Sequence, residues 1–190
     1  MSRAYRIRVR ESLKKVIKAS DHISTDLELL EILPCDQMGQ LLEEELLRRG
    51  FEREDEKLVR KQNGLTVTID PTEGTVTVQS EADESLELAA EREGRVYDDM
   101  RKTAEKRVRE ELAGQMKEDL EKQATQRKEK LQEKVTEKLE AGLNDLQGEL
   151  GQVVNRVTAE ALKRKAAQLG QIKELTEDPE SGSMTIVLEV

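Results

Sequence analysis

The chain has 190 residues, of which 35% are hydrophobic, 2% are aromatic and 38% are charged. Because aromatic side chains are so scarce, Leu, Val and Ile must supply most of the buried surface, which favours strands and a helical seam over a deep globular core. The formal net charge of −9 argues against a general binder of nucleic acid or of an anionic membrane, since both need a net positive surface.

Charge is distributed unevenly along the chain. Residues 1–19 carry seven basic residues and one acidic residue, whereas residues 21–56 carry twelve acidic and three basic residues. The basic segment either faces an acidic partner or stays within the molecule, solvated or paired with the acidic segment that follows it. A nucleic-acid role confined to this segment is the less favoured interpretation.

The number of cysteines and the hydropathy of the chain indicate its cellular compartment. Cys35 is the single cysteine, so there is no intramolecular disulfide framework and a reducing compartment is expected. No apolar run approaches the ~18 residues that would span a bilayer, and the first residues lack the apolar core of a signal peptide. We therefore expect a cytoplasmic protein that does not bind membranes.

The first predicted elements are a strand and a helix. In residues 4–13 apolar and basic side chains alternate (Tyr5, Ile7 and Val9 against Arg6, Arg8 and Arg10), which predicts a half-buried edge strand. Residues 16–33 have mixed periodicity and are expected to form an extended or partly helical element ending at Pro34. An amphipathic helix follows: Asp36 is its expected cap, Gly50 its stop, and the apolar stripe comprises Met38, Leu41, Leu42, Leu46 and Leu47.

A three-strand meander is predicted for residues 57–81. Asn63-Gly64 is a favoured tight-hairpin pair, and residues 70–74 (DPTEG) supply the second turn. The alternating Leu65, Val67 and Ile69 are expected to face the helix. Residues 1–92 are thus predicted to form one small α+β domain, an antiparallel sheet half-covered by a helix.

A long charged helical arm, residues 93–170, comes next. Apolar residues recur mostly at steps of four, as in Ala104, Val108, Leu112, Met116, Leu120 and Ala124, so a straight or slightly right-handed helical pairing is favoured over a left-handed heptad seam. Gly142, Gly148 and Gly151 mark a possible bend or hairpin. An unbroken helix of ~75 residues would reach roughly 110 Å. We expect the arm to fold back as a helical hairpin or to form a homodimer.

Residues 171–190 are predicted to form a C-terminal β-hairpin. Asp178-Pro179-x-x-Gly182 repeats the spacing of the turn at residues 70–74, either as a true internal repeat or because such turns favour these residues. The apolar terminal strand should pair with a sheet or a partner. The predicted fold class is α+β, with domains at residues 1–92, 93–170 and 171–190.

No catalytic, cofactor-binding or metal-ligating residue is predicted, and no cofactor. His22 is the single histidine and is expected at the surface, while Cys35 has no base nearby and is expected to be a packed or incidental thiol. Glu43-Glu44-Glu45 and Asp98-Asp99 lack calcium-loop spacing, so solvated helix faces are expected, as for the basic trio Lys163-Arg164-Lys165. The chain is therefore predicted not to be an enzyme.

Three segments carry a family resemblance: MSRAYRIRVRESLKK, LELLEILPCDQM and VTAEALKRKAAQLGQIKELTEDPESGSMTIVLEV. In these the chain resembles an accessory, X-type component of bacterial ternary conflict systems organised around an FtsH-type or MoxR-type AAA NTPase and a von Willebrand factor A protein. None is a catalytic motif. The resemblance implies these proteins as the partner class, with a role as an adaptor or substrate-side factor for the NTPase. Because the chain also lacks a catalytic motif and has a long arm and a free terminal strand, we predict a non-enzymatic adaptor that binds its partners through its β modules and helical arm. The alternative is a coiled-coil or stalk-like assembly subunit. In that case charge reversal at Lys128, Lys130 and Lys134 should disrupt assembly.

Overall fold

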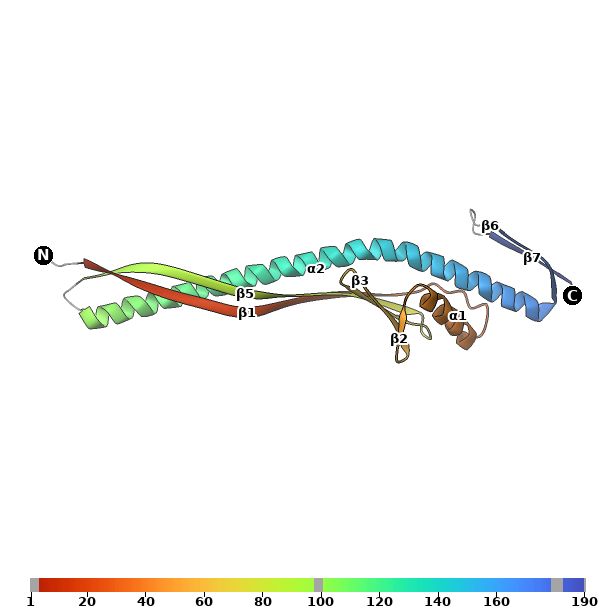
Figure 1. Cartoon of the computed structure of the whole chain (residues 1–190), viewed down its shortest axis with the longest axis horizontal. Helices are drawn as coiled ribbons and strands as arrows, with labels where there is room; N and C mark the ends of the chain where they lie inside the picture. The colour runs from red at the N-terminus through yellow and green to blue at the C-terminus, as the bar shows by residue number, and fades with distance from the viewer. Residues whose placement is uncertain (1–3, 98–100, 179–182, 190) are drawn as a thin grey trace. The chain divides into compact units, whose positions relative to one another are not determined.

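The computed structural model describes residues 4–97, 101–178 and 183–189. The fold is α+β, as predicted: an antiparallel sheet, a long helix and a C-terminal hairpin (Figure 1). The elements are β1 (Ala4–Asp26), α1 (Cys35–Arg48), β2 (Glu52–Glu54), β3 (Lys57–Gln62), β4 (Leu65–Asp70), β5 (Thr75–Tyr97), α2 (Arg101–Leu169), β6 (Gln171–Asp178) and β7 (Ser183–Glu189).

Contacts divide the chain into two compact units. Unit one comprises Met1–Ser20 and Glu81–Val135, and unit two comprises Asp21–Ser80 and Thr136–Val190. The elements β1, β5 and α2 contribute residues to both units. The domain boundaries expected after residues 92 and 170 stay a prediction.

Unit one is a two-stranded ribbon packed on a helix. Residues 4–20 of β1 lie beside residues 81–97 of β5, and we call this pair the ribbon. One face of the ribbon packs on α2, where Ile17 and Leu86 share a core with Val135. Ile7, Val96, Met116 and Leu120 are also buried. The predicted alternation of buried and exposed side chains therefore holds around Ile7, because Arg6, Arg8 and Arg10 are exposed. The side chain of Tyr5 is not among those described.

The strands in this part of the chain are longer than predicted, and of the two alternatives for residues 16–33 the extended one holds as far as Asp26. The strand predicted at residues 4–13 continues to Asp26, and no helix forms before Pro34, because Ile17 and Ala19 keep the period-two burial that Ile7 begins. The meander's last strand likewise runs on to Tyr97. These extensions form the ribbon, which buries the apolar stripe of α2 that was expected to need a second helix or a second copy.

The backbones of β5 and α2 approach closely at Gly94. A Cβ built there would lie 2.9 Å from Leu112 Cδ1 and 2.9 Å from Val108 Cγ1 on α2, and 3.3 Å from Ile7 Cγ1 on β1. A side chain at this position would therefore push the ribbon off the helix.

Unit two contains the predicted meander. Strand β3 pairs antiparallel with β4, and β4 with residues 75–80 of β5. Asn63 and Gly64 both have positive φ, 53° and 70°, as a tight type I′ hairpin turn requires. At the second turn the Asp70 carboxylate accepts hydrogen bonds from the backbone N–H groups of Thr72 and Glu73, at 2.9 and 3.1 Å. The sequence-predicted turn chemistry is confirmed here.

Helix α1 covers the meander with a slightly different face from the one predicted. Met38, Leu41, Leu42 and Leu46 are buried with Val67 and Ile69 of β4. Leu47 is 45% exposed, so its predicted place in the stripe was wrong. The helix begins at Cys35 after Pro34 and has no side-chain cap. Asp36 therefore lies in the first turn, where its charge favours the positive helix end, and Gly50 ends the helix with a φ of 82°.

The arm is one continuous helix, not a helical hairpin. The helix continues through Gly142, which makes room for Leu65 of β4: the Leu65 Cδ1 would clash with a Cβ at residue 142. At Gly148 and Gly151 an added Cβ would meet open space. Leu139, Leu146, Leu150, Val153, Val157 and Ala161 join the core with α1 and the meander, so in unit two, too, the partner of the helix is the chain's own β structure.

The C-terminal hairpin is confirmed as a two-stranded sheet of its own, separate from the five-stranded sheet. The pairing of β6 with β7 runs from Gln171 opposite Glu189 to Asp178 opposite Ser183, with an irregularity between Ile172 and Glu174. The turn that was expected to repeat residues 70–74 falls on residues 179–182, which lie outside the described residues.

Candidate functional site

The apolar face of the C-terminal hairpin is the first candidate surface. Residues opposite one another in an antiparallel pair share a face, so the pairing puts Ile172 with Leu188 and Leu175 with Ile186 on one face. Met184 lies on the same face, opposite Glu177, which forms an ion pair with Lys163 of α2. The other face carries Glu174, Thr176, Thr185 and Val187.

None of the described hairpin residues is buried. The side chains of the apolar face are at best half-buried, Leu175 is 40% exposed, and Val187 on the other face is 42% exposed. An isolated two-stranded hairpin is at best marginally stable in water, because it has no third layer on which to bury a face. The hairpin therefore presents strand edges and an apolar face that the described chain covers only in part.

The outward face of the ribbon is the second candidate surface, and it carries two rows of opposite charge. Arg8 Nε lies 2.8 Å from Glu93 Oε1, Arg10 Nε lies 2.8 Å from Glu91 Oε2, and Lys14 Nζ lies 2.7 Å from Glu87 Oε1. The basic side chains remain about two-thirds to three-quarters exposed. Exposed pairs of this kind contribute on the order of 0.2–1 kcal/mol each to stability.

This finding corrects an expectation about the basic segment. Residues 1–19 do stay within the molecule at Arg8, Arg10 and Lys14, but their partners lie on β5 and not in the acidic residues 21–56. Those partners were hidden because residues 81–97 were not recognised as a strand.

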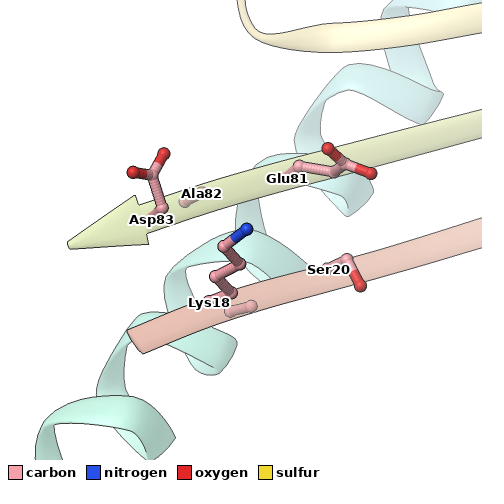
Figure 2. Close-up of a pocket in the computed structure, with 6 residues that line it drawn as sticks. Lys18, Ser20, Glu81, Ala82 and Asp83 are labelled. Carbon is pink, nitrogen blue, oxygen red and sulfur yellow. The ribbon is translucent and has the colours of Figure 1, made fainter. Parts of the chain in front are cut away.

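An open pocket lies further along the same ribbon, lined by Lys18, Ala19 and Ser20 of β1 and by Glu81, Ala82 and Asp83 of β5. Figure 2 shows Lys18 and Ser20 on one strand, next to the strand that carries Glu81, Ala82 and Asp83. These side chains continue the two charged rows, basic on β1 and acidic on β5. The pocket therefore belongs to the outward face of the ribbon.

The residues considered from sequence are scattered over the fold. His22 and Cys35 are exposed, and the Cys35 thiol donates to the carbonyl of Thr72 at 3.6 Å. Thus His22 lies at the surface as expected, and Cys35 is not packed. Asp98-Asp99 falls outside the described residues. Within the described ranges no group of three or more His, Cys, Asp or Glu residues is arranged to hold a metal ion.

The two charge clusters predicted to be solvated are instead partly ion-paired. Glu43 pairs with Arg53, and Glu44 with Arg164. Glu45 is buried, and its carboxylate accepts a hydrogen bond from Arg49 Nε at 2.9 Å. Arg48 and Arg156 form longer ion pairs with the same carboxylate. From the basic trio, Lys163 pairs with Glu177, while Lys165 is exposed. These clusters join elements of unit two to one another.

A two-pronged ion pair joins β3 to α2. The guanidinium of Arg60 donates two hydrogen bonds to Glu149, raising its own pKa and lowering the pKa of the Glu149 carboxyl. The same guanidinium stacks on Phe51 with its carbon 4.5 Å from the ring centre. All three groups lie inside the fold of unit two, so this cluster is structural.

The fold and its surfaces define an α+β protein whose open strand edges and apolar hairpin face suit contact with other proteins. A family model described as FtsH ternary system domain X5 matches residues 1–190, and the chain belongs to that family. Neither the curated proteins nor the solved structures include a match to the chain. None of the helices in the described ranges is long and apolar enough to cross a membrane. The family name makes the chain a component of a multi-protein system, as the sequence resemblance implied.

Proposed function

We propose that the chain is a non-enzymatic, cytoplasmic accessory protein of an FtsH ternary system, which binds the AAA NTPase component through its C-terminal hairpin. The observation that carries the proposal is the exposure of this hairpin: none of its described residues is buried. The family name supports the choice of partner, because the system is named after an FtsH-type protein.

The hairpin suits this role physically. Its outer strands can add to an open sheet edge of the partner, where main-chain hydrogen bonds give affinity and alternate side chains give specificity. Full burial of a Leu or Ile side chain contributes roughly 1.5–3 kcal/mol. Ile172, Leu175, Met184, Ile186 and Leu188 therefore offer enough apolar surface for a stable complex.

Substitutions on the two hairpin faces test the proposal. Leu175→Asp with Ile186→Asp introduces charge into the apolar face, and Thr176→Asp with Thr185→Asp makes the matched change on the opposite face, because both are directly opposed pairs. Binding of the purified full chain to the NTPase component is measured by calorimetry.

We expect the first variant to bind at least about tenfold more weakly, and the second to bind like the wild type. Equal effects of the two variants would contradict a role for the apolar face. If the chain bound only the von Willebrand factor A protein, that protein would replace the NTPase component as the proposed partner.

A further inference from the structure

The two strands of the C-terminal hairpin have different outer edges. In the described sheets β6 and β7 pair only with each other, so each has an edge without a described strand beside it. Strand β6 carries Lys173, Glu174 and Glu177, and its pairing is irregular between Ile172 and Glu174. Charged side chains and bulges are the features that keep a sheet edge from accepting a further strand. The edge of β6 is therefore protected.

The edge of β7 lacks this protection. From Ser183 to Leu188 the strand has neither a charged residue nor a proline, and its pairing with β6 is regular from Ser183 to Val187. Its one charged residue, Glu189, already forms an ion pair with Lys173 at 2.8 Å. Such an edge adds readily to another strand, and a two-stranded hairpin needs further strands for independent stability. A third strand is therefore expected beside β7.

Strand β7 is complementary to a second copy of itself. Two β7 strands can run antiparallel with Ile186 opposite Ile186. In that register the remaining pairs are Met184 with Leu188, Thr185 with Val187, and Ser183 with Glu189. The only charged residue thus faces a serine, and no like charges meet. Apolar and β-branched cross-strand pairs contribute roughly 0.2–1 kcal/mol each, so every described position of β7 gains a compatible neighbour.

The surroundings of the hairpin suit this contact. A two-fold axis perpendicular to the sheet would keep the apolar faces of both hairpins on one side, in a continuous sheet of order β6-β7-β7-β6. Lys163 of α2 pairs with Glu177 of β6, the strand away from the new contact. Strands lie about 4.8 Å apart, which puts the centres of the two hairpins about 9.6 Å apart. Packed helices need about 8–10 Å, so there is room for an α2 helix beside each hairpin.

From these relationships we infer that the chain forms a two-fold symmetric dimer, in which the outer edges of two β7 strands pair antiparallel around Ile186. The contact joins identical surfaces, so it closes at two copies. It differs from the homodimer through the helical arm that the sequence suggested. It is also independent of the NTPase contact, because it uses a strand edge and leaves the apolar faces available. One pair of strands is a small interface, so the dimer should dissociate on dilution.

Sedimentation velocity of the full chain over a wide concentration range provides the first test. We expect the 21.6 kDa chain to convert into a species of twice that mass as the concentration rises, and into nothing larger. A single 21.6 kDa species at every concentration would overturn the inference. Growth beyond the dimer would overturn it too, because an isologous contact leaves no further edge of β7 open.

Two outer-face variants test the register by charge. Thr185→Lys with Val187→Lys sets lysine opposite lysine twice across the dimer, while inside the hairpin the new lysines face Thr176 and Glu174. Its dimer should be at least about tenfold weaker than that of the wild type. Thr185→Glu with Val187→Lys sets opposite charges against each other instead, so it should dimerise at least as well as the wild type. Both should keep the wild-type circular dichroism, and equal dimerisation of the two would overturn the inference.

A disulfide gives the sharpest test. In a Cys35→Ser chain, Ile186→Cys puts thiols on directly opposed residues, whose Cα atoms lie about 4.5–5.5 Å apart, within the range of a disulfide. Oxidation should therefore link two copies. Leu175→Cys in the same background is the matched control, because Leu175 lies opposite Ile186 on the same face but would be about 14 Å from its counterpart, across three strand spacings. Equal linking of both variants, or none at Ile186→Cys, would overturn the inference.

Discussion

Arg60 and Glu149 join β3 to α2 through two parallel hydrogen bonds, from Nη1 to Oε1 at 2.7 Å and from Nη2 to Oε2 at 2.6 Å. The two side chains are 16% and 28% exposed, so water screens this pair less than it screens the exposed pairs of the ribbon. The planar fork of Arg matches a carboxylate in a way that Lys cannot.

Glu149→Gln should destabilise unit two. The amide keeps the size of the side chain but accepts only one of the two charge-assisted hydrogen bonds, which leaves the largely buried Arg60 guanidinium less well paired. We expect a loss of roughly 1–3 kcal/mol in the free energy of unfolding, measured by urea denaturation. Arg60→Lys should cost a similar amount, and a change within error for both variants would contradict the role given to this pair.

The same pair predicts a pH dependence. Hydrogen bonding from Arg60 lowers the pKa of the Glu149 carboxyl below its ordinary value of 4.5. A depressed folded-state pKa stabilises the protein above the unfolded pKa, and this contribution is lost as the pH falls through the folded pKa. The stability difference between wild type and Glu149→Gln should therefore be constant near neutral pH and shrink below about pH 4.5. A difference that grows in acid would contradict the assignment.

Two glycines of α2 should respond in opposite directions to alanine. Gly148 faces open space, so Gly148→Ala should stabilise the helix by about 0.8–1 kcal/mol. Gly142 makes room for Leu65, so Gly142→Ala should destabilise by about 1–3 kcal/mol through overpacking. Urea denaturation of both variants gives the comparison. Equal stabilisation by the two substitutions would show that β4 does not pack against the helix at Gly142.

Gly94 provides the corresponding test in unit one. Gly94→Ala should cost about 1–3 kcal/mol, because the new methyl group meets Leu112 and Val108 of α2. Adding Leu112→Ala should recover part of that cost, so the two substitutions should be non-additive by at least about 0.5 kcal/mol. Gly114→Ala, at a helix position with open space, is the control. Strict additivity would contradict contact between ribbon and helix at this point.

Local patterns in the sequence were sufficient to predict much of the fold. Asn63-Gly64 and Asp70 predicted two turns because their conformations depend on those residue types and on few distant contacts. The helix at Met38–Leu46 followed from its apolar spacing, and the helical conformation of the arm from its Ala, Leu, Glu and Lys content, but not its continuity through Gly142, Gly148 and Gly151. The fold class and the family resemblance were confirmed.

The ribbon was missed because composition and periodicity disagree in residues 81–97. Glu and Ala are poor strand formers, and this stretch was passed over between a meander and a helix. Its alternation was nevertheless visible: Ala82, Leu86 and Leu88 point to α2, while Asp83, Glu87 and Glu91 point outward. Without that strand, the apolar stripe of α2 had no partner in the chain, and dimerisation or a helical hairpin was the remaining solution.

The candidate surfaces could be predicted only in part. The β-hairpin followed from the strand chemistry of residues 171–190, but its exposure and its separation from the main sheet are tertiary properties with no local pattern. The ion pairs of Arg8 with Glu93 and of Arg60 with Glu149 join residues far apart in sequence. A single sequence offers many equally good charge partners for each of these residues.

Hydrogen exchange of the hairpin amides, with and without the NTPase component, tests the central claim most directly. In the isolated chain the amides of β6 and β7 should exchange much faster than those of β3 and β4, because none of the described hairpin residues is buried. Addition of the NTPase component should slow exchange in β6 and β7 and leave β3 and β4 unchanged. Unchanged exchange in the hairpin, with protection appearing elsewhere on the bound chain, would contradict the hairpin as the docking element.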